Sequence, residues 1–326
     1  MVRKKHIRHS LTAILVIAAL YAMGLAGQTT PVPERAGPEP EFPATGEHSR
    51  LGADSCILCH NEGMALDATP IFATPHAART DPQAPFSDLQ CESCHGPGKD
   101  HARAQRGGGD VPPPMTFGAR ARTPAAEQND VCLACHETQG RLGWFGSMHE
   151  AQEVPCAACH QVHRETDRVF DPLAQQQACF DCHQEQRADT LRTSNHPLRF
   201  GEMTCSDCHD PHAGHHDFLL SEPTVNQTCY TCHAEKRGPF LWEHAPASED
   251  CTLCHRPHGS NFEAMLTKRT PLLCQQCHSP MGHPSLAYTP ELENDAFANR
   301  FLLARGCLNC HSQVHGSNHP SGVTLQ

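Results

Sequence analysis

A five-residue pattern, Cys-x-x-Cys-His, occurs ten times in this 326-residue chain and uses all 20 of its cysteines. The cysteine pairs are Cys56 and Cys59, Cys91 and Cys94, Cys132 and Cys135, Cys156 and Cys159, Cys179 and Cys182, Cys205 and Cys208, Cys229 and Cys232, Cys251 and Cys254, Cys274 and Cys277, and Cys307 and Cys310. The histidines that complete the motifs are His60, His95, His136, His160, His183, His209, His233, His255, His278 and His311. No cysteine is left for a disulfide or a catalytic thiol.

Three chemistries use a Cys-x-x-Cys pair: zinc binding, a redox disulfide and covalent attachment of haem c. Only haem attachment requires histidine next, because the cysteines form thioether bonds to the haem vinyl groups and the histidine binds the iron. Histidine makes up 26 of the 326 residues. Ten pairs would all be followed by histidine by chance with a probability of about 10⁻¹¹. The pattern therefore predicts ten covalently bound haem c groups, each with its iron.

The composition agrees with a core built around these groups. Only 6% of the residues are aromatic and 27 are proline, and few valine, isoleucine and phenylalanine residues are available to fill a core. A chain of this length is long enough to bury one. We expect haem to supply the missing apolar surface, so that folding depends on haem attachment as small metal domains depend on their metal.

The N-terminus predicts export from the cytoplasm. Residues 1–26 combine a basic start with an apolar run, and Gly24 and Ala26 suit cleavage by a signal peptidase after Ala26. An uncleaved membrane anchor is the alternative, since the run is at the lower length limit for crossing a bilayer. Residues 27–50 are proline-rich and acidic, which is typical of a linker. The predicted compartment is the periplasm.

The net charge argues against nucleic acid as a partner. The chain carries a formal charge of −11. Removal of residues 1–26 takes away four basic side chains, Arg3, Lys4, Lys5 and Arg8, so −11 minus 4 gives −15 for the processed chain. An acidic protein repels a phosphate backbone. Basic surfaces on other redox proteins are the better partners.

The stretch CTLCHRPHGS at 251–260 contains a second histidine, His258, after the motif histidine His255. Two histidines on opposite faces of one haem need Cα atoms about 12–13 Å apart, given ordinary metal–imidazole bond lengths. Three extended residues reach only about 10–11 Å. If His258 binds iron, it therefore binds a haem other than the one that His255 serves, and it holds the two haems together.

The extra histidines form an internal repeat. The motifs beginning at Cys56, Cys132, Cys179, Cys229 and Cys274 stand alone, and we call them lone motifs. The other five, the flanked motifs, have a histidine on each side: His76 and His101 around Cys91, His149 and His163 around Cys156, His196 and His212 around Cys205, His244 and His258 around Cys251, and His283 and His315 around Cys307. One lone and one flanked motif make a two-haem unit, so five units supply ten candidate distal ligands for ten haems.

The alternative for each flanking histidine is an ordinary exposed or hydrogen-bonded side chain. His48 is the first reserve ligand and His319 the second. The spacing leaves open which distal histidine serves which haem.

The predicted fold class is that of a multihaem cytochrome c, mostly coil with short α-helices and little or no β-structure, in an elongated stack of ten haems. Short helices should carry the motifs, because the Cys-x-x-Cys-His spacing closes about one helical turn. Residues 293–306 are the clearest longer helix, whereas 96–124 has the composition of a loop. The decahaem domain covers residues 51–322.

The sequence resembles the MtrA/DmsE family of periplasmic decahaem c-type cytochromes. The resemblance is carried by the ten motifs in their order and by four phrases: SNHPLRFGEMTCSDCHDPHAG at 194–214, GPFLWEHAPASEDCTLCHRPHGSN at 238–261, LLCQQCHS at 272–279 and GCLNCHSQVHGSNHPSG at 306–322. It implies an electron carrier inserted into an outer-membrane β-barrel, porin-like protein, with ten bis-histidine haems. Periplasmic or inner-membrane cytochrome donors and an outer-surface multihaem cytochrome are the implied partners.

Three functions compete. A conduit only transfers electrons and needs every iron position filled, whereas a multihaem reductase needs an open or weakly held axial position. Ten distal candidates suffice for ten haems, so we expect a conduit and no enzyme activity. A soluble periplasmic electron shuttle, without a barrel partner, is the remaining alternative.

Overall fold

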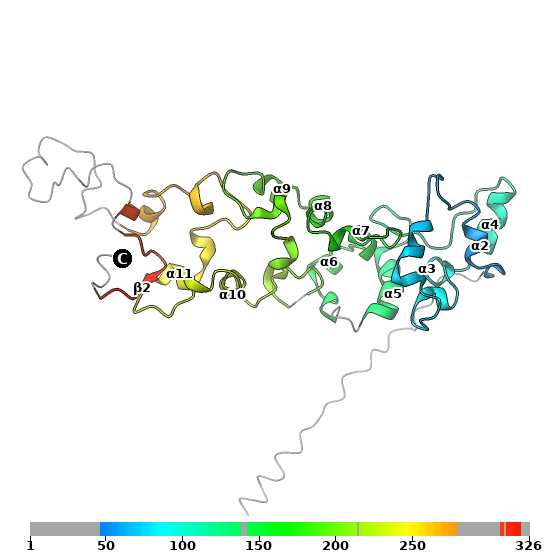
Figure 1. The fold of residues 1–326 in the computed structure, drawn as a ribbon, viewed down its shortest axis with the longest axis horizontal. Helices are drawn as coiled ribbons and strands as arrows, with labels where there is room; N and C mark the ends of the chain where they lie inside the picture. Colours follow the sequence, from blue (N-terminus) through cyan, green and yellow to red (C-terminus); the bar gives the residue numbers. More distant parts are fainter. Residues whose placement is uncertain (1–45, 138–141, 214, 279–306, 310, 321–326) are drawn as a thin grey trace, which may run out of the picture. The chain divides into compact units, whose positions relative to one another are not determined.

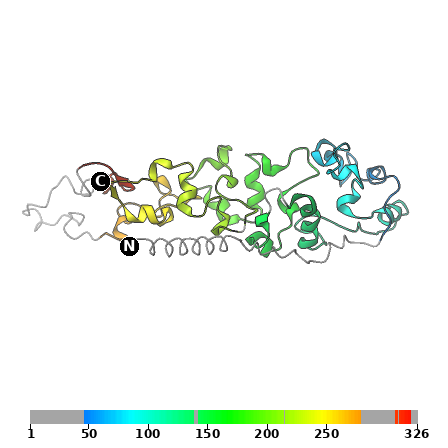
Figure 2. The same ribbon diagram turned by 90° about the horizontal axis from the view of Figure 1, so that it is seen from below.

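The computed structural model describes residues 46–137, 142–213, 215–278, 307–309 and 311–320. These residues all belong to one compact unit that runs from Phe42 to Gln326. Figure 1 and Figure 2 show this unit as short helices joined by long irregular segments. The predicted fold class is confirmed in this respect, because the described chain is mostly coil with short helices and very little strand.

The described helices are brief. The α-helices are α2 (Ala53–Cys56), α3 (Glu92–His95), α4 (Lys99–Arg106), α5 (Ala125–His136), α6 (Met148–Ala151), α7 (Cys156–Cys159), α8 (Gln175–Phe180), α9 (Gln184–Asp189), α10 (Val225–Tyr230) and α11 (Ala245–Glu249). The 3-10 helices are η1 (Thr69–Ala73), η2 (Pro75–Ala77), η3 (Pro85–Ser87), η4 (Leu142–Trp144), η5 (Arg168–Phe170), η6 (Pro197–Phe200), η7 (Cys205–Asp207), η8 (Asp217–Leu219), η9 (Ala234–Lys236), η10 (Cys251–Leu253), η11 (Glu263–Met265), η12 (Cys274–Gln276) and η14 (Cys307–Asn309).

Every motif begins inside or at the edge of one of these turns, as the spacing predicts. The N–H of the motif histidine donates to the carbonyl of the first cysteine, four residues earlier, as in His209 to Cys205 at 3.0 Å and His255 to Cys251 at 3.0 Å. This single helical turn brings both cysteine side chains and the histidine ring to one face.

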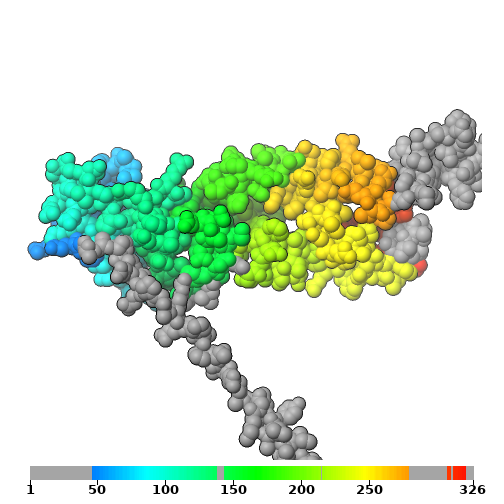
Figure 3. All heavy atoms as spheres, turned by 180° about the vertical axis from the view of Figure 1, so that it is seen from behind, coloured from blue at the N-terminus to red at the C-terminus, as the bar shows by residue number. Residues whose placement is uncertain are grey.

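In the part of the chain that the structure describes, strand pairing consists of short contacts between segments that are distant in the sequence. Strand β1 (Trp242–Glu243) pairs antiparallel with β2 (Gly316–Ser317), with Trp242 opposite Ser317 and Glu243 opposite Gly316. Helices contact their neighbours in the sequence: α5 with α7, α7 with α8, and α10 with η10. Figure 3 agrees, because residues of neighbouring colour pack against one another there.

The polypeptide has a small apolar core of its own. The buried apolar side chains include Phe86, Met115 and Phe180, and Met115 is the largest that is fully buried. In contrast, Phe170 and Phe218 are 74% and 79% exposed. A core so poor in large side chains matches the composition, which predicts that the chain packs against bound groups.

One sequence expectation is wrong and two others lie outside the described residues. Residues 96–124 are not all loop, because α4 occupies Lys99–Arg106; an Arg103–Asp100 ion pair of 2.9 Å joins two of its turns. The expected helix at 293–306 and the signal segment at 1–26 fall on residues that the structure does not describe. Among the described helices, none has the length and apolar character to cross a membrane.

Candidate metal centres

Histidine rings face one another in pairs throughout the described chain. Each pair joins one motif histidine to one flanking histidine. The ring centroids are 6.4 Å apart in His60–His101, 6.0 Å in His76–His136, 6.0 Å in His95–His163, 6.2 Å in His149–His183, 5.9 Å in His160–His212, 6.4 Å in His196–His233, 6.1 Å in His209–His258, 6.0 Å in His244–His278 and 6.1 Å in His255–His315. Nine of the ten predicted distal histidines are therefore placed opposite a predicted proximal one.

The separation fits one iron between the two rings. Two iron–nitrogen bonds of about 2 Å, plus about 1.15 Å from each nitrogen to its ring centroid, place the centroids about 6.3 Å apart. The observed range of 5.9 Å to 6.4 Å brackets this distance. Rings in direct contact lie closer, as in the T-shaped pair His215–His216, whose centroids are 4.3 Å apart and whose members belong to no motif. The donor set, two imidazoles beside two thiols, is the one that haem c takes.

The pairs follow two placements. A histidine that precedes a flanked motif faces the motif histidine of the next lone motif, as His149 faces His183. A histidine that follows a flanked motif faces the motif histidine of the previous flanked motif, as His163 faces His95. Both placements join segments from successive units. Each metal bound in this way would therefore hold two units together.

The chain ends depart from these placements. At the N-terminal end His101, on α4, faces His60 across its own unit. His283 lies outside the described residues, so the structure does not describe a partner from that segment for His311. His48 is not in a ring pair; its Nδ1 lies 3.7 Å from a carboxylate oxygen of Glu92.

Hydrogen bonds at Nδ1 leave Nε2 as the metal-binding atom of many rings. Nδ1 of His60 lies 3.1 Å from the carbonyl of Leu66, and Nδ1 of His209 lies 2.9 Å from that of Phe218. A carbonyl only accepts, so Nδ1 carries the hydrogen and Nε2 presents its lone pair. Such bonds fix the ring orientation at metal sites.

Hydrogen bonds from Nδ1 also connect three flanking histidines to the next unit. Their Nδ1 atoms donate to the carbonyl of the residue just before another flanking histidine. The bonds run from His149 to Pro211 at 3.2 Å, from His196 to Pro257 at 2.9 Å, and from His244 to Val314 at 2.8 Å. The orientation of one ring therefore depends on the position of the next unit.

Cysteines of successive motifs are also neighbours. Within each unit the first cysteines of the two motifs are joined by a side-chain hydrogen bond: Cys56 with Cys91, Cys132 with Cys156, Cys179 with Cys205, Cys229 with Cys251, and Cys274 with Cys307. Between units, second cysteines lie close enough that negative charge on one raises the pKa of the other: Cys135 acts on Cys94, Cys182 on Cys159, Cys232 on Cys208, and Cys277 on Cys254. The motifs therefore adjoin one another in sequence order.

The environment disfavours charge on these groups. Burial raises the pKa of the Cys94 thiol to about 11 and of the Cys229 thiol to about 12. Burial also lowers the pKa of five paired histidines, and neighbouring histidines lower it further in each: His76, His95, His163, His258 and His315. These imidazoles are neutral at pH 7, which is the form that binds metal.

Buried amide side chains clamp the two motifs of a unit, a feature that the sequence reading missed. Asn226 is 7% exposed; its amide donates to the carbonyls of Ala247 and Ser248, and its oxygen accepts from the N–H of Cys251 at 2.8 Å. Asn129 holds Val154 and Cys156 in the same way, at 3.1 Å and 2.7 Å. The common signal is asparagine three residues before the first cysteine of a lone motif.

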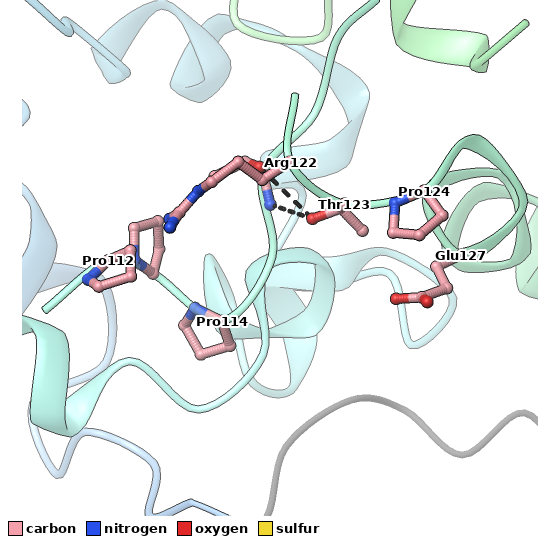
Figure 4. Close-up of a pocket in the computed structure, with 8 residues that line it drawn as sticks. Pro112, Pro114, Arg122, Thr123, Pro124 and Glu127 are labelled. Carbon is pink, nitrogen blue, oxygen red and sulfur yellow. Dashed lines mark hydrogen bonds between the residues drawn. The ribbon is translucent and has the colours of Figure 1, made fainter. Parts of the chain in front are cut away.

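Two cavities open on the surface of the described residues. One of about 400 Å³ is lined by Pro112, Pro113, Pro114, Thr116, Arg122, Thr123, Pro124 and Glu127, without a cysteine or histidine (Figure 4). Thr123 Oγ1 accepts the N–H of Thr116 at 2.9 Å across it. The other, of about 300 Å³, lies beside His255 and His258. Only the second adjoins histidines of the ring pairs.

The motifs match known protein families. Two segments, 196–238 and 244–283, match the doubled CXXCH motif; residues 91–172 match the family of cytochrome c-type proteins like NrfB; and 41–96 match cytochrome c554 and c-prime. The fold and the sites thus define a multihaem c-type cytochrome, a protein that binds haem c covalently and transports electrons.

Curated relatives narrow this class. The chain is 45% identical to the multihaem cytochrome MtrA of Shewanella baltica, over 97% of this chain and 93% of that protein. It is 31% identical to NrfB of Haemophilus influenzae over 40% of this chain and 65% of the relative, and 24% identical to OmcB of Geobacter sulfurreducens over 80% of this chain and 32% of the relative. The chain belongs to the MtrA family, which confirms the resemblance inferred from the motifs.

Proposed function

We propose that this chain carries electrons between the periplasm and the outer membrane or cell exterior through ten bis-histidine haems, as the cytochrome part of a porin–cytochrome conduit. Haem c supplies the one-electron chemistry when bound. Residues 1–26 direct export, residues 27–50 form a linker, and residues 51–322 form the haem domain.

The nine ring pairs carry the proposal. Each pair provides two imidazoles at the separation that one iron needs, 5.9 Å to 6.4 Å between centroids. An iron held on both faces has no position for a substrate. Saturated centres support electron transfer rather than catalysis. For the tenth centre we propose His311 with His283, the predicted distal histidine that lies outside the described residues.

The order of contacts supports a continuous path. Successive motifs adjoin through their cysteines, within a unit as for Cys179 and Cys205, and between units as for Cys208 and Cys232. Groups attached at these cysteines would follow one another without a gap. A one-dimensional series of centres suits transport over a distance, since each centre needs only two neighbours.

The partners follow from the family. This chain is 45% identical to MtrA of Shewanella baltica over 97% of its length. That similarity supports the proposal that the chain lies in the periplasm and associates with an outer-membrane β-barrel. The proposed exchange partners are a periplasmic or inner-membrane cytochrome on one side and an outer-surface multihaem cytochrome on the other.

Fractionation followed by reconstitution tests this function. Cells that express the affinity-tagged chain are separated into periplasm, inner membrane and outer membrane, and haem staining locates the chain. The complex purified from the outer membrane is then placed in liposomes that contain reduced methyl viologen. External ferric citrate should oxidise the internal dye only when the complex is present.

The soluble-shuttle alternative predicts a different result. All of the haem-stained chain would then be recovered from the soluble periplasmic fraction, with no β-barrel protein co-purifying. Liposomes with a barrel protein but without the cytochrome are the control, and oxidation of the dye at the same rate in that control would contradict the conduit.

A further inference from the structure

The environment of the pair His160–His212 differs from that of the other described pairs. Nδ1 of His160 lies 2.7 Å from a carboxylate oxygen of Asp167, and the Asp167 side chain is only 15% exposed. On the opposite ring, Nδ1 of His212 lies 3.8 Å from a carboxylate oxygen of Asp210. Among the pairs in the described ranges, this is the one whose two rings both lie within 4.0 Å of a carboxylate.

The two following units show what Asp167 replaces. There the motif histidine of the flanked motif donates to a backbone carbonyl: His209 to Phe218 at 2.9 Å and His255 to Ala264 at 2.8 Å. Both carbonyls belong to residues with positive φ, 57° and 52°, inside a tight turn. In the unit of His160 the acceptor is a full negative charge instead of a neutral carbonyl.

A carboxylate at Nδ1 changes what the ring gives to iron. It draws the proton from Nδ1 and makes Nε2 a stronger donor, which favours the more positive, oxidised metal. The negative charge of Asp167 acts in the same direction through space, and partial burial weakens its screening by water. Both effects lower the reduction potential of the iron that His160 binds.

The positive charge of the adjacent Arg168 opposes this effect. Its guanidinium donates to the carbonyl of Ala158 at 2.9 Å and to a carboxylate oxygen of Asp181 at 3.0 Å. The ion pair with Asp181 balances the charge of Arg168, whereas Asp167 contacts the ring itself. The direct hydrogen bond therefore decides the sign.

We propose that Asp167 is a potential-tuning residue, which makes the haem of Cys156 and Cys159 the centre of lowest reduction potential in the chain. The proposal rests on the proposed haem ligation but not on the conduit. In a series of centres this one accepts an electron last and loses it first. It would then separate the haems before it from the haems after it, and both groups would accept electrons before it does.

The test is a potentiometric titration of the purified haem-loaded protein, with Asp167→Asn as the variant. Asparagine keeps one oxygen that can accept from the ring of His160. The N–H of Val169, which lies 3.4 Å from the other carboxylate oxygen of Asp167, loses that longer capping bond. The expected result is that the most negative of the ten titrating components moves to higher potential, with haem content unchanged. Asp167→Glu restores the charge and should return this component toward its original potential.

Asp207→Asn is the matched control. Asp207 lies inside the motif beginning at Cys205, but its carboxylate accepts the backbone N–H of Thr204 at 2.7 Å and contacts no histidine of a pair. Its removal should shift any haem by less than about half as much as removal of Asp167, since only the through-space effect is lost.

Two results would overturn the proposal: no component moves in Asp167→Asn, or Asp207→Asn shifts a component equally. If Asp167→Asn loses a haem, Asp210→Asn tests the same centre, because it removes the charge beside His212; no shift of the lowest component there would likewise overturn it. Ten low-spin haems with unshifted potentials would refute only this inference, whereas missing or high-spin haems would refute the ligation.

Discussion

The ring of His258 faces the ring of His209, with centroids 6.1 Å apart, while His255 faces His315 at 6.1 Å. The second histidine of CTLCHRPHGS thus lies opposite the motif histidine of the preceding flanked motif. The reach of three residues forbids a shared iron with His255, and the observed partner is in a different unit.

Replacement of His258 by methionine should change the haem of Cys205 and Cys208. A thioether favours reduced iron more than an imidazole does, so one midpoint potential should rise. Paramagnetic NMR should show that His258→Met and His209→Met perturb the same haem. His215→Met is the control, because His215 contacts only His216 among ring partners. A perturbed haem at Cys251 and Cys254 in His258→Met would contradict the pairing.

Gly259 should be required for the position of His258. Its φ is +134°, and a Cβ there would collide with the carbonyl oxygen of Asp189. Gly259→Ala should cost more than about 1 kcal/mol of local stability and displace His258. A high-spin EPR signal from one haem would report the displacement.

The control for this glycine is Gly146→Ala. Gly146 also has a positive φ, +83°, but a Cβ there meets nothing within 4 Å. This variant should remain fully low-spin. Equal high-spin signals in the two variants would mean that general backbone strain, and not the contact with Asp189, is responsible.

The Asn226 clamp should stabilise the contact between two motifs. Asn226→Leu removes three hydrogen bonds and leaves the N–H of Cys251 without this acceptor, at a cost of about 1–3 kcal/mol for a buried group. Hydrogen exchange at the Cys251 amide should become faster. Asn61→Leu is the control, since Asn61 bonds only to carbonyls of its own turn, Ile57 and Leu58. Unchanged exchange in Asn226→Leu would contradict the clamp.

The candidate ligands could be read from sequence because covalent haem attachment imposes a fixed local pattern. The pairing could not, because it depends on which units adjoin: His76 and His136 meet only once the chain has folded. The groups that accept hydrogen bonds from the histidine Nδ1 atoms could not be predicted from the sequence either. Most are backbone carbonyls, such as that of Met115 for His95, which any residue could supply. The helix α4 was missed because glycine and proline on both sides dominate its composition.

Haem content, measured together with EPR of the fully oxidised protein, tests the central claim most directly. The account predicts ten haems per chain, all low-spin with two histidine ligands, because the nine described pairs and the proposed tenth pair of His283 with His311 would supply two imidazoles to each iron. A stoichiometric high-spin signal would contradict it, since one iron would then have an open face where a substrate could bind.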